Sequence, residues 1–369
     1  MNLLWHPLSP IPISLFSPAF KNNYNLEVIK INGNCFATGI GSLPHKDAKA
    51  ACDFVLKFCP QLPFWPQLPQ RDSRENMYTM FFDHLPALRK KGGTVYIESQ
   101  ATAAFEEFYL QLLEEPNKVA AVSESHAAAL HEMLSRELDD RESFAFKGQL
   151  TGPISFGLQM KDEFDKPILY NEVLLDIVVK SLVEHIKWQE EQLSKFARET
   201  LLFIDEPYMA LVGTPFATIE QETIQRVINE LCAAAKGTIG LHCCANTDWA
   251  LLLECNIDVI SFDAYEYAAN FLLYKEKVAE FLKRGGMIAW GLVPTARKQI
   301  LENDVVSLYK KFMFLIERLA QSSAIPLEKI LVASLLTPAC GLGSRDIATA
   351  KRVFELTFQL SETIRKEYF

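Results

Sequence analysis

Two residues that commonly bind metals stand two positions apart, directly after an apolar run. His242 and Cys244 follow the run Thr238–Leu241, with Cys243 between them. In an extended strand, residues i and i+2 point to the same side, so both side chains can face one ion while Cys243 packs elsewhere. Zinc accepts imidazole and thiolate ligands, whereas calcium and magnesium require oxygen atoms. The spacing therefore predicts part of a zinc site.

Two more candidate ligands follow apolar runs further along the chain. Asp263 closes the run Ile257–Phe262, and Cys340 comes shortly after Ile330–Leu335. A single buried cysteine or histidine is more commonly a core residue, and that interpretation is favoured for most of the other cysteines. His242, Cys244, Asp263 and Cys340 together complete a tetrahedral donor set for zinc.

The apolar runs alternate with longer helical patterns, which is typical of repeated βα units. Helical patterns include 47–58, 167–198, 220–235, 305–321 and 346–364. Eight strands are predicted, at Cys35–Ile40, Leu62–Trp65, Ala145–Leu150, Leu201–Asp205, Thr238–Leu241, Ile257–Asp263, Met287–Gly291 and Ile330–Leu335. The predicted fold class is α/β, as a (β/α)8 TIM barrel. In such a barrel the carboxyl ends of the strands form the face that carries the chemistry.

The domain organisation follows from the same alternation. Residues 1–34 are predicted to precede the barrel, and residues 35–369 to form a single barrel domain. The segment 76–141, between the second and third predicted strands, is interpreted as an insertion on the barrel because no linker brackets it. It contains a possible extra strand at 92–97 and helices around 105–113 and 123–138.

Composition excludes several classes of protein. The chain has 369 residues, of which 49% are hydrophobic and 22% charged, as expected for a globular protein with a sizeable core. A formal net charge of -9 argues against nucleic acid or an anionic membrane as the partner. No apolar run is long enough to span a bilayer, and the proline-rich start lacks a basic leader. A cytoplasmic location and reduced cysteines are therefore expected.

Six motifs, in order, resemble the superfamily of cobalamin-independent methionine synthase and uroporphyrinogen decarboxylase. They lie at 38–42 (Thr-Gly-Ile-Gly-Ser), 150–153 (Leu-Thr-Gly-Pro), 204–207 (Ile-Asp-Glu-Pro), 242–244 (His-Cys-Cys), 258–263 (Asp-Val-Ile-Ser-Phe-Asp) and 337–342 (Thr-Pro-Ala-Cys-Gly-Leu). The sequence looks most similar to the catalytic C-terminal barrel of that synthase. It is also similar to zinc enzymes that move a methyl group from a corrinoid protein to a thiol.

The resemblance implies roles for individual residues. Zn²⁺ would be held by His242, Cys244, Cys340 and an acidic residue, which is Asp263 here where the family has glutamate; Glu266, further along, is the alternative. The substrate carboxylate would be bound by Ile40, Gly41 and Ser42, and the substrate amine by Asp205. The family's second amine-binding residue, a glutamate, is expected near 70–73, where Asp72 is the candidate. Arg71 and Arg74 are alternative contacts for an anionic acceptor or donor, or else begin a solvated helix.

The resemblance also implies a reaction. Zinc lowers the pKa of a bound thiol, and two thiolates with a carboxylate keep the site electron-rich, so a zinc-dependent S-methyltransferase is expected. Its substrate would be a small thiol, with homocysteine giving methionine. The synthase has an additional N-terminal barrel for its folate donor that this sequence lacks, so a methylcorrinoid protein or a simple methyl compound is favoured as donor. The alternatives are methylation of another thiol, a metal-free decarboxylase, and a non-catalytic zinc or corrinoid partner module.

Overall fold

Seven parallel strands form a curled sheet at the centre of the molecule. The computed structural model describes residues 31–82, 84–137 and 143–369, so most of the predicted pre-barrel segment lies outside the described residues. The strand order is β1-β9-β8-β7-β6-β5-β4, and every neighbouring pair is parallel. The bounds are β1 Phe36–Ala37, β4 Ala145–Thr151, β5 Glu199–Asp205, β6 Thr238–Cys243, β7 Val259–Phe262, β8 Met287–Val293 and β9 Ser334–Pro338.

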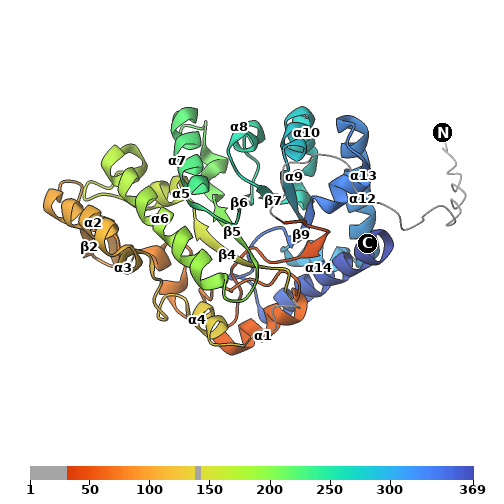
Figure 1. Ribbon diagram of the computed structural model, residues 1–369, viewed down its shortest axis with the longest axis horizontal. Coiled ribbons are helices and arrows are strands. Elements are labelled where there is room, and N and C mark those ends of the chain that lie inside the picture. Colours follow the sequence, from red (N-terminus) through yellow and green to blue (C-terminus); the bar gives the residue numbers. More distant parts are fainter. Residues whose placement is uncertain (1–30, 83, 138–142) are drawn as a thin grey trace, which may run out of the picture.

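Helices cover the outer side of this sheet (Figure 1). Those that follow the sheet strands are α1 Ala48–Phe58, α5 Pro153–Gln159, α6 Glu172–Leu193, α7 Gln221–Ala234, α8 Trp249–Glu254, α9 Ala264–Phe271, α10 Lys275–Lys283, α11 Arg297–Glu302, α12 Val305–Ser323, α13 Leu327–Val332 and α14 Ile347–Tyr368. The side chains of Asp248 and Asp346 accept hydrogen bonds from the first turns of α8 and α14, which they cap.

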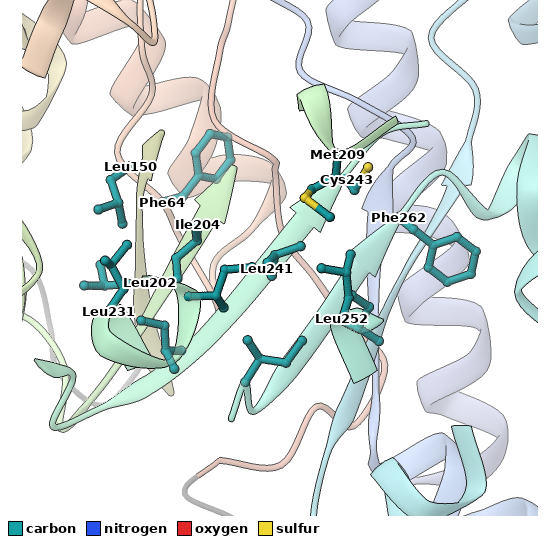
Figure 2. Packing of buried hydrophobic residues seen from close by; sticks show 14 of the residues in the cluster. Phe64, Leu150, Leu202, Ile204, Met209, Leu231, Leu241, Cys243, Leu252 and Phe262 are labelled. Atoms are coloured by element: carbon teal, nitrogen blue, oxygen red, sulfur yellow. The ribbon is translucent and has the colours of Figure 1, made fainter. Parts of the chain in front are cut away.

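Buried apolar side chains separate into two clusters. The larger lies between the sheet and its helices, and Figure 2 shows Leu202, Ile204 and Leu241 among its strand residues. The smaller cluster includes Ala145, Leu201 and Phe203 and lies on the opposite face of the sheet. Because strand residues alternate between faces, this second cluster marks the inner side of the curl.

The second predicted strand, Leu62–Trp65, is not a strand in the structure. It makes a single isolated bridge between Phe64 and Lys147 on β4. Proline stands at every third position of this segment, at 60, 63, 66 and 69. Since proline has no N–H to donate, a continuous ladder cannot form there. The last predicted strand also differs in its bounds, because Ile330–Val332 ends helix α13 and the strand begins at Ser334.

The segment 76–137 holds a hairpin and three helices. Strands β2 Leu88–Lys91 and β3 Thr94–Ile97 pair antiparallel, and Gly92 and Gly93 turn between them at φ +57° and +89°. Two consecutive positive φ angles are favourable only for residues such as glycine, which explains the turn. Helices α2 Thr102–Glu114, α3 Pro116–Ala120 and α4 Ala128–Leu134 follow. None of the helices in the described ranges is both long and apolar enough to cross a membrane.

Candidate metal centre and substrate cavity

The carboxyl end of β6 presents the first two candidate ligands. Gly240 and His242 alternate with Leu241 and Cys243 along the strand, and Cys244 follows directly. Cys243 belongs to the outer apolar cluster, where Figure 2 shows it with Met209. His242 and Cys244 therefore point to the inner side, as their spacing predicts, and His242 pairs in register with Asp205 on β5.

The structure brings His242, Cys244 and Cys340 together. One ligand atom from each lies within 4.8 Å of the others. His242 Nδ1 is 3.0 Å from Ser261 Oγ, while its Nε2 is buried with no hydrogen-bond partner in the described ranges. With the Nδ1 proton donated to Ser261, Nε2 keeps a free lone pair. A second hydrogen bond that fixes the tautomer in this way is usual for metal-binding histidines.

The two cysteines of this group influence each other's proton affinity. A hydrogen bond between the sulfur atoms lowers the pKa of Cys244 and raises that of Cys340, and burial of the Cys340 thiol adds to its increase. Loss of a proton is therefore favoured at Cys244 over Cys340. A divalent cation bound between them would displace the thiol protons. The donor set fits zinc.

The two acidic candidates for the fourth ligand lie outside this three-residue group. Asp263 is the N-cap of α9, and its Oδ1 accepts the N–H of Glu266 at 2.9 Å. Burial raises the pKa of Asp263 to about 6, although its hydrogen bonds and His242 oppose the increase. Glu266 is exposed and accepts a hydrogen bond from the Gln299 amide.

A cavity of about 440 Å³ opens onto the group. Residues predicted to bind the substrate carboxylate and amine line the same cavity as the three ligands, although they come from widely separated segments. The lining includes Ile40, Gly41, Ser42, Gln67, Gln70, Glu75, Asp205, His242, Cys244, Cys340, Gly341 and Gly343. The carboxyl edge of the sheet thus joins thiols, carboxylates and backbone amides around one space.

Asp205 also lines this space. The residue is 6% exposed, and its Oδ1 is buried without a hydrogen-bond partner among the described residues. Burial raises its pKa to about 6, while the charges of His242 and Lys147 oppose the increase. A buried carboxylate oxygen without a donor is a favourable site for an ammonium group.

Ser42 lies at the other side of the cavity, against the loop that follows β9. Its Oγ accepts the N–H of Gly343 at 3.1 Å, which leaves the hydroxyl proton available to an anion. A Cβ on Gly341 would collide with that oxygen. Glycine at 341 therefore lets the loop that carries Cys340 approach Ser42.

The acidic residue near position 72 that lines the cavity is Glu75. Asp72 instead caps the 3-10 turn Ser73–Glu75 (η1) and pairs with Arg74 at 2.7 Å. Glu75 is fully buried, pairs with Arg71 at 2.6 Å and accepts the N–H of Leu68. Burial raises its pKa, and the Arg71 hydrogen bond opposes that shift. Asp72 is thus not among the cavity residues, and Glu75 was missed because the sequence shows only an acidic residue at an apparent helix start.

The motifs at 150–153 and 204–207 meet through Glu206. Its carboxylate accepts the N–H groups of Ile154 and Ser155 at 2.9 and 2.7 Å, at the start of α5. A Cβ on Gly152 would collide with this carboxylate. The motifs therefore stabilise the turn beside the site, because a negative group satisfies the free amides of a helix start.

The fold has counterparts among solved structures. No protein-family model and no curated protein matches the sequence. The chain is similar to the structure of a B12-independent methionine synthase from Shewanella sp. W3-18-1 in complex with selenomethionine, with a TM-score of 0.56 and 14% identity. The match covers 90% of this chain and 98% of that chain. The chain has this synthase's fold.

A second similar structure is a methyltransferase from Methanosarcina mazei, with a TM-score of 0.49 and 10% identity over 86% of each chain. The first match confirms the expected resemblance to the methionine synthase-like barrels at the level of the fold.

Proposed function

We propose that this protein is a zinc-dependent S-methyltransferase that methylates the thiol of homocysteine or a closely similar amino acid, giving methionine in the first case. The observation that carries the proposal is one cavity lined by a His-Cys-Cys group, by acidic side chains and by Ser42. Homocysteine needs these three kinds of contact for its thiol, its ammonium and its carboxylate.

The metal would be held by His242, Cys244 and Cys340, with Asp263 or Glu266 as the fourth ligand. Zinc bound there would lower the pKa of the substrate thiol and keep it as a thiolate at neutral pH. Ser261 contacts the His242 ring through Nδ1, so Nε2 would be the nitrogen that binds the ion. In the transfer, a bond forms between the substrate sulfur and the methyl carbon. The bond from that carbon to the donor breaks, and its electron pair leaves with the donor.

The acidic residues would orient the substrate. Asp205 would offer its unpaired oxygen to the ammonium group. Glu75, which also lines the cavity, would take the role that the resemblance gives to Asp72. The Ser42 hydroxyl and the Gly41 amide would bind the carboxylate. Contacts to the substrate's ammonium and carboxylate groups would hold its thiol in place, and such positioning supplies much of the rate increase of an enzyme.

The comparison adds support for an amino-acid substrate. The matched synthase is described as binding selenomethionine, an analogue of the product proposed here. A methylcorrinoid protein or a simple methyl compound as donor stays a prediction from the sequence. A metal-free decarboxylase would leave the His-Cys-Cys group without a purpose.

We also propose that residues 35–369 form one closed eight-unit barrel that includes the segment 76–141 as an insertion. Backbone hydrogen bonds of residues 61–67 support this. On one side, the Trp65 N–H donates to the Lys147 carbonyl. On the other side, the Gln67 N–H donates to the Gly41 carbonyl.

The test is the metal content of the purified protein and its zinc-edge absorption spectrum. We expect about one zinc per chain and one additional sulfur neighbour when L-homocysteine is added. The Cys340→Ser variant should lose most of the zinc and all thiol methylation while its circular dichroism is unchanged. Cys243→Ala is the matched control, because this neighbouring cysteine faces the core and should keep the metal. Full zinc and activity in Cys340→Ser would exclude the assignment.

A further inference from the structure

A lysine is buried inside the curled sheet, close to the residues that line the cavity. Lys147 lies on β4 and is fully buried. It shares the inner side of the sheet with Phe203, whose ring centre is 4.4 Å from its Nζ. Within the described ranges Lys147 forms no ion pair. An ammonium group without a carboxylate at such a depth is unfavourable unless other contacts compensate it.

The compensating contacts of Lys147 are with neutral groups. Nζ donates to the Ile40 carbonyl at 2.8 Å and to Gln149 Oε1 at 3.3 Å, and it also faces the ring of Phe64. Burial lowers its pKa to about 8, while the nearby Asp205 opposes that shift. The nearby Asp205 charge thus favours the ammonium form, which the neutral contacts stabilise only in part.

The bond to Ile40 fixes the orientation of the next peptide group. The described chain contains no cis peptide, so the Ile40 carbonyl and the Gly41 N–H point in opposite directions. The carbonyl points toward Lys147, and the N–H therefore points away from it. Both Ile40 and Gly41 line the cavity, and no described residue accepts the Gly41 N–H. That amide is left available to a ligand.

The described lining of the cavity holds no lysine or arginine that could bind an anionic group, and two of its residues are acidic, Glu75 and Asp205. Two arginines directly follow lining residues in sequence: Arg71 is paired with Glu75, and Arg345 is exposed. Besides the proposed metal, Lys147 behind the 40–41 peptide is therefore the buried positive group beside this part of the cavity.

We propose that Lys147 is the positioning residue that makes this cavity selective for thiols bearing a carboxylate. It holds the 40–41 peptide so that the Gly41 N–H faces the ligand, and it supplies the balancing charge from below. The inference rests on the proposed function and extends it, because it assigns the carboxylate preference to a residue that does not touch the substrate. The close packing agrees with this role, since a Cβ on Gly41 would lie 3.0 Å from Gln67 Oε1 and 3.2 Å from the Gln149 side chain.

The test compares two thiols that differ only in the carboxylate. Calorimetric titration of the zinc-loaded protein would give dissociation constants for L-homocysteine and for 3-aminopropanethiol, which is homocysteine without its carboxylate. Wild type should prefer L-homocysteine by at least about tenfold. Lys147→Met should weaken L-homocysteine binding by about ten- to a hundredfold and change 3-aminopropanethiol binding by less than about threefold.

Several outcomes would overturn the proposal. Either equal binding of the two thiols by wild type or an unchanged preference in Lys147→Met would do so. If the Met variant does not fold, Lys147→Gln, which keeps a donor without the charge, should show the same loss of preference, and a retained preference would count against Lys147. Lys161→Met is the matched control, because this lysine is exposed and pairs with Asp165. Wild type that binds neither thiol would instead refute the proposed function.

Discussion

Two polar atoms in the site lack a hydrogen-bond partner, and they belong to residues that face each other on adjacent strands. Asp205 and His242 are in register on β5 and β6, and both Asp205 Oδ1 and His242 Nε2 are buried without partners among the described residues. Each unsatisfied buried group costs about 1–3 kcal/mol. The proposed ligands would recover this cost: an ammonium group for the carboxylate and a metal ion for the imidazole.

Glu75 and Asp72 allow the amine contact to be tested at the level of single residues. Glu75→Gln should weaken L-homocysteine binding by about tenfold, because an ammonium group loses a charged acceptor. Binding of 4-mercaptobutanoate, which lacks the amine, should change by less than about threefold. Asp72→Asn is the control, since its carboxylate caps η1 outside the cavity. Equal losses for both thiols in Glu75→Gln would show that Glu75 only supports the turn through Arg71.

At the scale of elements, periodicity predicted most of the sheet correctly. β4 to β8 overlap their predicted strands closely, because fully buried parallel strands read as apolar runs. The strand predicted at 62–65 is absent because prolines interrupt its hydrogen-bond ladder. The strand predicted at Ile330–Val332 is absent because a short apolar run fits a helix end as well as a strand. Pattern alone does not distinguish these cases, since the tertiary neighbours decide them.

The candidate site divides in the same way. His242, Cys244 and Cys340 were recognisable because their spacing and strand-end positions follow from backbone geometry. Glu75 and Lys147 were not, because their importance depends on burial against distant segments. In the sequence, Glu75 stands where an exposed helix is expected to begin, and Lys147 stands as a polar residue within a predicted strand. Only the curled sheet and the segments packed against it place both next to the cavity.

Helix α6 carries a histidine whose burial predicts a pH dependence of stability. His185 Nδ1 lies 2.6 Å from the Ala120 carbonyl at the end of α3, and its ring packs against Phe81. Burial lowers its pKa to about 4, although the bond to Ala120 opposes the shift. Between pH 6.5, the ordinary value for histidine, and about 4, the unfolded chain binds a proton that the folded chain excludes. Stability from this group is thus present at neutral pH and is lost as the pH falls.

Urea unfolding at pH 7 and pH 5 would measure this effect. His185→Gln should be less stable than wild type at pH 7, where it loses packing, yet should lose less stability on acidification. The difference between the two pH dependences should reach about 1–2 kcal/mol at pH 5. His131→Gln is the control, since its ring is half-buried and bonded to the Val122 carbonyl. Identical pH dependences for wild type and His185→Gln would contradict the assignment.

At the scale of the whole molecule, the site requires both ends of the curled sheet to meet. The cavity joins Ser42, which follows the edge strand β1, to Asp205, which lies on β5 next to the opposite edge strand β4. Between these edges lies the proline-rich segment 61–67. Its non-proline residues still have N–H groups to donate. The Trp65 N–H donates to the Lys147 carbonyl at 3.3 Å, and the Gln67 N–H to the Gly41 carbonyl at 3.1 Å. The segment thus links the two edges without forming a strand.

Amide hydrogen exchange, resolved by residue, would show whether this linkage makes a closed barrel in solution. The N–H groups of Gln67 and Leu43 bond across the seam, with Leu43 donating to the Gln67 carbonyl at 2.9 Å. In a closed barrel they open only with the sheet, so they should exchange at least about a thousandfold more slowly than the Gly93 amide of the exposed hairpin. That ratio corresponds to an opening free energy of about 4 kcal/mol. Exchange of Gln67 and Leu43 at the hairpin rate would mean that the sheet is open at this edge, and that Ser42 and Asp205 are held together only by side-chain packing.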